Sequence, residues 1–170
     1  KKIMNKKIKL SNFTIKNDSD RLTFISGPCL LENDKMVYRV ASKLSSLSKK
    51  YKFNLIFKCS FDKANRSSHK SKRSQMSLNA AMDILKTIKK DFKLAVTTDV
   101  HETSQISKLV EYIDVIQIPA FLSRQTDLII AAADTQKIIN VKKGQFLAHS
   151  EVINIIKKIE SRKNKSIIIT

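Results

Sequence analysis

Short apolar runs alternate with longer amphipathic stretches along this chain, and this alternation constrains the fold more than any other feature. The amphipathic stretches carry apolar residues at the 3.6-residue spacing of a helix. Strands and helices in regular succession predict an α/β fold with a parallel sheet and right-handed crossovers. The predicted strands are 22–26, 53–57, 94–100, 115–120, 137–141 and 166–169, and the predicted helices are 35–50, 77–92, 104–112, 126–134 and 151–163.

Local signals support several of these boundaries. Glu32-Asn33-Asp34 offers an N-cap and first-turn carboxylates to the first helix, and Ser150 is expected to cap the last. Gly27-Pro28 stops the first strand and makes a tight turn. The apolar stripes of the first two helices are Val37, Val40, Ala41, Leu44 and Leu47, and Leu78, Ala81, Met82, Leu85 and Ile88.

The length of the chain limits how large the sheet is. A complete (β/α)8 barrel typically needs about 250 residues, and this chain has 170. We therefore expect a single domain, 1–170, that is a TIM barrel truncated after about six strands, with a short N-terminal hairpin over 6–15. An open doubly wound sheet is the alternative. Polar residues recur at the C-terminal ends of nearly all strands and not at one switch point, which favours the barrel.

The net charge of +18 suggests, taken alone, a polyanionic partner such as nucleic acid. The lysines are spread over nearly every segment, however, and no RNA-binding or zinc-finger signature accompanies them. A general compositional bias explains this pattern at least as well as a binding face does. There is no run of about 20 apolar residues, which argues against a membrane span. Cys29 and Cys59 show no CxxC spacing, and two cysteines fit a reducing cytoplasm.

The stretch 57–68, FKCSFDKANRSS, carries the strongest chemical signal. It follows an apolar run that reads as a buried strand, and it places Lys58, Lys63 and Arg66 close together. Side chains alternate along a strand, so Lys58 and Ser60 should share one face. Cations beside hydroxyls and an amide suit phosphate and carboxylate groups. A basic, solvated loop is the other interpretation of the same residues.

Similar polar residues follow the other predicted strands, and the carboxyl ends of barrel strands meet in one active-site mouth. Each residue taken alone also has an ordinary structural role, such as capping a loop or filling the core. Together they indicate a site for a small, multiply anionic substrate. The residues are Cys29, Lys58, Ser60, Lys63, Asp99, His101, Gln117, Asn140 and Lys142.

The stretch 57–68 resembles the signature of the 3-deoxy-D-manno-octulosonate 8-phosphate synthases. Four further blocks are similar to this family in the same order. They are SGPC with Glu32 at 26–32, TDVHE at 98–102, VIQIPAFLSRQTD at 115–127 and NVKKGQF at 140–146. A sibling family, which builds a seven-carbon aromatic precursor from erythrose 4-phosphate, shares the GPC turn but does not usually carry KANRSS.

The resemblance implies a cytoplasmic transferase that condenses phosphoenolpyruvate with arabinose 5-phosphate on a (β/α)8 barrel, in lipopolysaccharide precursor synthesis. It implies catalytic roles for Lys63, Asp99 and His101. It also implies an oligomer, usually a tetramer, in which Arg124 reaches the sugar phosphate of a neighbouring subunit. The implied phosphoenolpyruvate ligands are Lys58, Ser60, Lys63, Gln117 and Lys142, and the implied sugar-phosphate ligands are Asn65, Arg66, Ser67 and Arg124.

The resemblance makes Cys29 a ligand of a divalent metal, and a thiolate suits zinc or iron. The family's other metal ligands, a His, a Glu and an Asp, and a phosphate-binding Arg are expected beyond Thr170. The family's Gly-rich turn is replaced here by Ser71-Lys72-Arg73-Ser74-Gln75-Met76-Ser77, which has no glycine. We accordingly expect the 170 residues by themselves to be inactive, as a fragment or an inactive remnant, and a nucleic-acid-binding protein remains the alternative from another class.

Overall fold

The computed structural model describes residues 7–74 and 76–170, and its chain divides into two compact units. The N-terminal unit runs to Val96, and the C-terminal unit is Thr97–Thr170. The predicted hairpin is present as β1 (Lys7–Lys9) paired antiparallel with β2 (Thr14–Lys16). Residues 1–6 and 75, which include the start of the predicted hairpin and one residue of the altered turn, lie outside the described residues.

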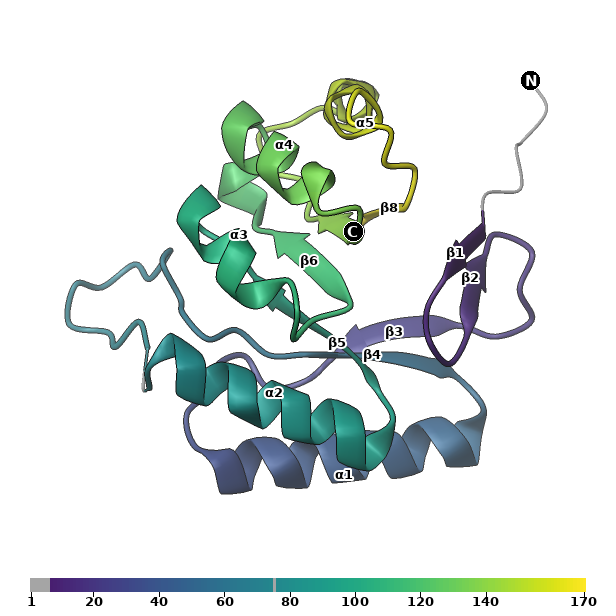
Figure 1. Ribbon diagram of the computed structural model, residues 1–170, viewed down its shortest axis with the longest axis vertical. Coiled ribbons are helices and arrows are strands. Elements are labelled where there is room, and N and C mark those ends of the chain that lie inside the picture. Colours follow the sequence, from purple (N-terminus) through teal and green to yellow (C-terminus); the bar gives the residue numbers. More distant parts are fainter. Residues whose placement is uncertain (1–6, 75) are drawn as a thin grey trace. The chain divides into compact units, whose positions relative to one another are not determined.

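The remaining strands and helices alternate as predicted (Figure 1). Within the described residues the strands are neighbours in chain order, β3-β4-β5-β6-β7-β8, and the pairs β3–β4, β5–β6, β6–β7 and β7–β8 are parallel. The strands are β3 (Thr23–Ser26), β4 (Asn54–Lys58), β5 (Ala95–Asp99), β6 (Val115–Ile118), β7 (Ile138–Val141) and β8 (Ile167–Ile169). An unreversed order is that of a (β/α)8 barrel, whereas a doubly wound sheet reverses at its switch point. The predicted α/β barrel-type topology is therefore confirmed.

Two long helices form one layer of the N-terminal unit. Helix α1 (Asp34–Tyr51) packs against β4 and against α2 (Leu78–Phe92) (Figure 1). Asn33 caps α1 through Met36 N at 2.8 Å, as the sequence predicts, and Ser77 caps α2. The stripe of α2 is buried except for half-buried Leu78. In α1 only Val37 and Ala41 of the predicted stripe are fully buried, with Ser45, because Val40, Leu44 and Leu47 stand at the edges of the buried face.

A tyrosine joins the two helices at their outer edge. The Tyr38 hydroxyl donates to Asp91 Oδ2 at 3.0 Å, and its ring lies 4.9 Å from that of Phe92. The hydrogen bond to the carboxylate holds the phenol proton, which raises the pKa of Tyr38 above its ordinary value of 10.0. This contact links residues in α1 and α2 that are far apart in the sequence.

The C-terminal unit repeats the same alternation on a smaller scale. Helix α3 (Thr103–Leu109) contacts α4 (Thr126–Asp134), and α4 contacts α5 (Val152–Glu160). The single-turn helices are η1 (Ala120–Leu122) and η2 (His149–Glu151). The core of this unit is aliphatic and includes Ile116, Ile118, Ile129, Ile139 and Ile159.

One predicted helix start is wrong. Ser150 does not cap α5, because it lies inside η2, and Glu151 is the N-cap residue. The chain makes a 3₁₀ turn before it becomes α-helical, a common arrangement at helix ends. Helix α5 also ends at Glu160 and not at 163, and Lys163 adopts a left-handed φ of 61°. The strands begin and end within one or two residues of their predicted limits.

In the part of the chain that the structure describes, no helix is both long enough and apolar enough to cross a membrane.

Candidate functional site

Strand β4 carries the predicted anion-binding residues of the N-terminal unit. It is buried along Asn54–Phe57 and ends at half-buried Lys58. Lys58 Nζ donates a hydrogen bond to Ser60 Oγ, so the two side chains lie on the same side as predicted. Phe57, Cys59 and Ser60 are completely buried. The strand end thus holds an ammonium group and a hydroxyl together at the rim of an apolar core.

The segment after Gly27 lies directly beside this strand end. Gly27 sits where an added Cβ would be 2.0 Å from the Lys58 carbonyl oxygen, so only a residue without a side chain permits this approach. Leu31 N then donates to Ser60 O at 2.9 Å. Cys29, between these contacts, is exposed. The backbone on either side of Cys29 therefore lies beside the end of β4, and the role of its thiol stays a prediction.

The described residues do not assemble a metal site. Across 7–74 and 76–170, no three His, Cys, Asp or Glu side chains gather in a group that could hold a metal ion. Cys29 alone supplies one ligand, whereas zinc sites in proteins take three or four. The described residues therefore do not form a complete metal site by themselves, and the role of Cys29 as a metal ligand stays a prediction.

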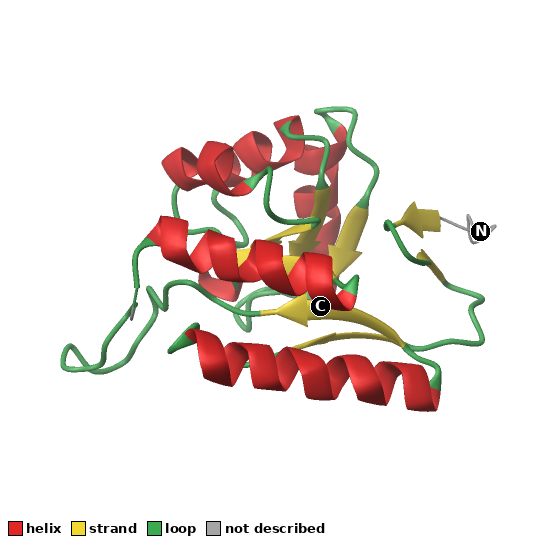
Figure 2. Ribbon diagram, turned by 60° about the horizontal axis from the view of Figure 1, so that its bottom comes forward, coloured by secondary structure: helices red, strands yellow, loops and turns green. Residues whose placement is uncertain are grey.

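The β4–α2 loop, residues 59–77, carries the remaining predicted ligands of this unit. Figure 2 shows it extending away from α1 and α2. Its first residues are buried, Lys63 is half-buried, and 64–74 are exposed, including Asn65, Arg66 and Ser67. These three side chains are therefore accessible to a ligand. An exposed position also fits the basic, solvated loop that the sequence leaves open.

A ladder of hydrogen-bonded polar side chains crosses the strand ends of the C-terminal unit, and three of its four members are buried. The parallel register places Asp99 beside Gln117 and Gln117 beside Asn140. Gln117 Nε2 donates to Asp99 Oδ1, and Asn140 Nδ2 donates to Gln117 Oε1 at 3.1 Å. Thr170 Oγ1 then donates to Asn140 Oδ1 at 3.3 Å. We call Asp99, Gln117, Asn140 and Thr170 the polar ladder.

The polar ladder explains why these groups tolerate burial. Asp99 and Gln117 are each 5% exposed and Asn140 is 1% exposed. Buried polar groups need hydrogen-bond partners, and a connected network holds each group in one orientation. The polar ladder includes three residues predicted from the sequence, Asp99, Gln117 and Asn140. Asn140 appeared among the strand-end residues without an assigned role, and Thr170 was missed because nothing local distinguishes it.

Removing the centre of the polar ladder should destabilise the protein. In Asn140→Ala, Gln117 Oε1 loses its donor in a buried site, so the free energy of unfolding should fall by about 1–3 kcal/mol. Urea unfolding measures this loss. Asn17→Ala, at an exposed turn residue, is the matched control and should change stability by less than about 0.5 kcal/mol. Equal losses in the two variants would contradict a structural role for the ladder.

The other predicted residues of the C-terminal unit lie at or near strand ends. Lys142 follows β7 and is exposed, with its backbone N bonded to Ile118 O at 3.0 Å. His101 follows β5 and is half-buried, and its backbone N is bonded to Gln105 Oε1 at 2.8 Å. Arg124 is exposed after η1. Their roles in binding or catalysis stay predictions.

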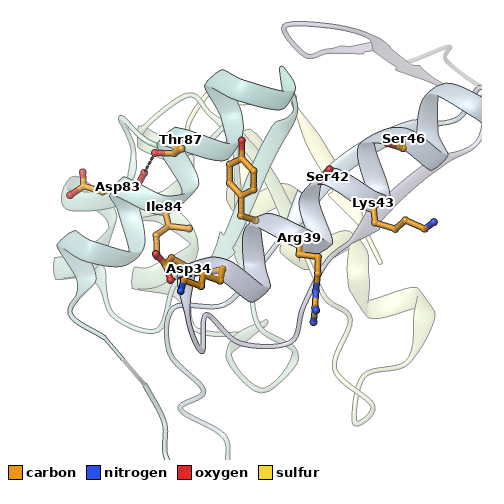
Figure 3. Close-up of a pocket in the computed structure, with 10 residues that line it drawn as sticks. Asp34, Arg39, Ser42, Lys43, Ser46, Asp83, Ile84 and Thr87 are labelled. Atoms are coloured by element: carbon orange, nitrogen blue, oxygen red, sulfur yellow. Dashed lines mark hydrogen bonds between the residues drawn. The ribbon is translucent and has the colours of Figure 1, made fainter.

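A cavity of about 850 Å³ lies elsewhere, between the outer faces of α1 and α2. Figure 3 shows Arg39 and Lys43 on α1 and Asp83, Ile84 and Thr87 on α2 along its walls. None of the residues predicted for the site lines this cavity. The strand ends, and not this cavity, carry the candidate chemistry.

Comparison with known proteins supports the sequence resemblance. Three curated relatives are called 2-dehydro-3-deoxyphosphooctonate aldolase. Those from Protochlamydia amoebophila and Fusobacterium nucleatum are each 44% identical over 96% of this chain, and that from Brucella anthropi is 41% identical over 98%. The chain spans 58–59% of the length of these relatives.

A family model provides the assignment itself. The model described as the DAHP synthetase I family matches residues 5–170, which is nearly the whole chain. The match includes both the β4 strand end and the polar ladder. The chain therefore belongs to the DAHP synthetase I family.

Proposed function

We propose that the protein condenses phosphoenolpyruvate with arabinose 5-phosphate to give 3-deoxy-D-manno-octulosonate 8-phosphate and inorganic phosphate. The observation that carries the proposal is the end of β4, where Lys58 is bonded to Ser60 beside an accessible loop with Lys63, Asn65 and Arg66. The names of the relatives support the same eight-carbon product, because phosphooctonate is an eight-carbon acid phosphate and an aldolase makes or breaks a carbon–carbon bond.

The proposed reaction balances without a redox step. Carbon 3 of phosphoenolpyruvate attacks the aldehyde carbon of the sugar phosphate, and the aldehyde oxygen takes up a proton to become a hydroxyl. Water adds at carbon 2, and inorganic phosphate leaves. Charge develops on the aldehyde oxygen during the attack, and a fixed ammonium stabilises such charge. Lys63 is the group that we assign to this role.

The remaining residues bind and orient the substrates in this proposal. Lys58, Ser60, Gln117 and Lys142 hold the carboxylate and phosphate of phosphoenolpyruvate, and Asn65, Arg66 and Ser67 hold the sugar phosphate. The polar ladder fixes the amide of Gln117 through Asp99 and Asn140. His101 lies beside Asp99 in sequence, and we keep both as candidate catalytic groups. Arg124, exposed after η1, is proposed to serve a neighbouring subunit of a homo-oligomer.

A binding and turnover experiment on the natural full-length protein tests the function. We expect phosphoenolpyruvate to bind saturably at physiological salt by calorimetry, and arabinose 5-phosphate to release inorganic phosphate faster than erythrose 4-phosphate does. A preference for erythrose 4-phosphate would favour the sibling reaction. The charge of +18 supports one other candidate, a nucleic-acid-binding protein. Its signature is nucleic-acid affinity that falls steeply with salt and is independent of sequence, without substrate turnover.

A further inference from the structure

Asp62 and Arg73 form a two-pronged ion pair across the base of the β4–α2 loop. Arg73 Nη2 donates to Asp62 Oδ2 at 2.6 Å, and Arg73 Nε donates to Asp62 Oδ1 at 3.2 Å. The backbone adds a third contact, from Lys63 N to Arg73 O at 2.8 Å. All three contacts join the two ends of the same exposed segment. We call this set of contacts the loop clasp.

The loop clasp joins a buried carboxylate, that of Asp62, to an exposed guanidinium, that of Arg73. The Asp62 side chain is 12% exposed and that of Arg73 is 60% exposed. Most exposed ion pairs contribute little to stability, but a two-pronged arginine–carboxylate geometry is an exception. Asp62 is anchored next to Phe61, which is 6% exposed. The clasp therefore ties the later part of the loop, at Arg73, to the rim of the core.

The segment that the loop clasp closes contains the proposed sugar-phosphate ligands. Residues 64–72 lie between the clasped ends and are all exposed, and Asn65, Arg66 and Ser67 are among them. Lys63 lies at the clasp itself, and its amide is one of the bonded groups. Tying the ends of a segment reduces the number of conformations that it samples, which lowers the entropy lost when a ligand orders it.

We propose that Arg73 is a positioning residue, which fixes Lys63 and the proposed ligands Asn65, Arg66 and Ser67 for the sugar phosphate without touching the substrate itself. The expected change in kcat/KM rests on the proposed function, whereas the expected change in amide exchange does not. The planar guanidinium fork matches a carboxylate, whereas a lysine supplies a single point of attachment. Arg73→Lys should therefore keep the charge but recover the clasp only in part.

The test combines amide hydrogen exchange, kinetics and thermal unfolding of the natural full-length protein. The variants are Arg73→Ala, Arg73→Lys and, as a matched control, Lys72→Ala, the removal of an exposed cation one residue earlier. In Arg73→Ala the Lys63 amide should exchange about tenfold faster, and kcat/KM for arabinose 5-phosphate should fall by about tenfold to a hundredfold. Arg73→Lys should lie between the wild type and Arg73→Ala. Lys72→Ala should match the wild type.

The thermal midpoint separates positioning from a general loss of structure. We expect it to change by less than about 3 °C in Arg73→Ala, because the segment that loosens is exposed. If the Lys63 amide of Arg73→Ala exchanges at the wild-type rate, the proposal is overturned. Faster exchange with an unchanged kcat/KM would also overturn it. So would a loss of kcat/KM that is accompanied by a large fall in the thermal midpoint, because general loss of structure would then explain it. A further outcome is that the wild type shows no turnover of phosphoenolpyruvate with either sugar phosphate, while the Lys63 amide still exchanges faster in Arg73→Ala. In that case the proposed function and the positioning role fail, but the loop clasp stands.

Discussion

Replacing Lys63 by alanine is expected to reduce turnover of phosphoenolpyruvate and arabinose 5-phosphate by about a hundredfold or more. Lys63 is half-buried where the β4–α2 loop leaves the core, and its backbone N is bonded to Arg73 O. The substitution keeps that backbone bond and removes the ammonium group. The loss should appear mainly in kcat, because the charge acts where negative charge develops during the reaction.

Steady-state release of inorganic phosphate measures this effect in the natural full-length protein. Lys70→Ala, in the exposed part of the same loop, is the control for the loss of one positive charge and should retain near-normal kcat. Lys63→Arg keeps the charge but changes its shape and reach, so it should recover only part of the activity. Near-normal turnover in Lys63→Ala would remove Lys63 from the catalytic group.

Gly27→Ala is expected to damage both stability and activity. The added Cβ would be 2.0 Å from the Lys58 carbonyl oxygen and 3.2 Å from the Lys58 nitrogen, so the backbone of β3 or β4 must move. Forced overpacking of this kind typically costs about 1–3 kcal/mol of unfolding free energy. A displaced Lys58 should also weaken phosphoenolpyruvate binding, because small shifts of a ligand-binding group are costly.

The other glycine of the chain supplies the control. At Gly144 an added Cβ would meet the Phe146 ring at 2.7 Å, and that ring is half-exposed and can rotate away. Gly144→Ala should therefore cost less than Gly27→Ala in urea unfolding, and phosphoenolpyruvate affinity should fall further in Gly27→Ala. A larger loss of stability in Gly144→Ala would show that the contact between Gly27 and Lys58 does not limit the fold.

Local patterns in the sequence predict most of the elements correctly. Apolar periodicity locates the strands and helices, and the short polar segment Glu32-Asn33-Asp34 locates the N-cap of α1 at Asn33. Alternation along β4 predicts that Lys58 and Ser60 share a face, which their hydrogen bond confirms. Each of these features depends on residues a few positions apart, so the sequence alone contains the necessary information.

The tertiary structure decides the contacts between residues that are far apart in the chain. The partners in the polar ladder depend on the register between neighbouring strands, and Asp62 meets Arg73 only because the loop returns to the core. The sequence predicts Gly27 only as a turn residue. The structure shows that position 27 must be glycine because the Lys58 backbone lies too close for a Cβ. Ser45 is buried where Leu44 was expected, because the direction in which α1 packs selects its buried face. The sequence determines the succession of elements through local propensity and periodicity, whereas packing and strand register determine which side chains meet.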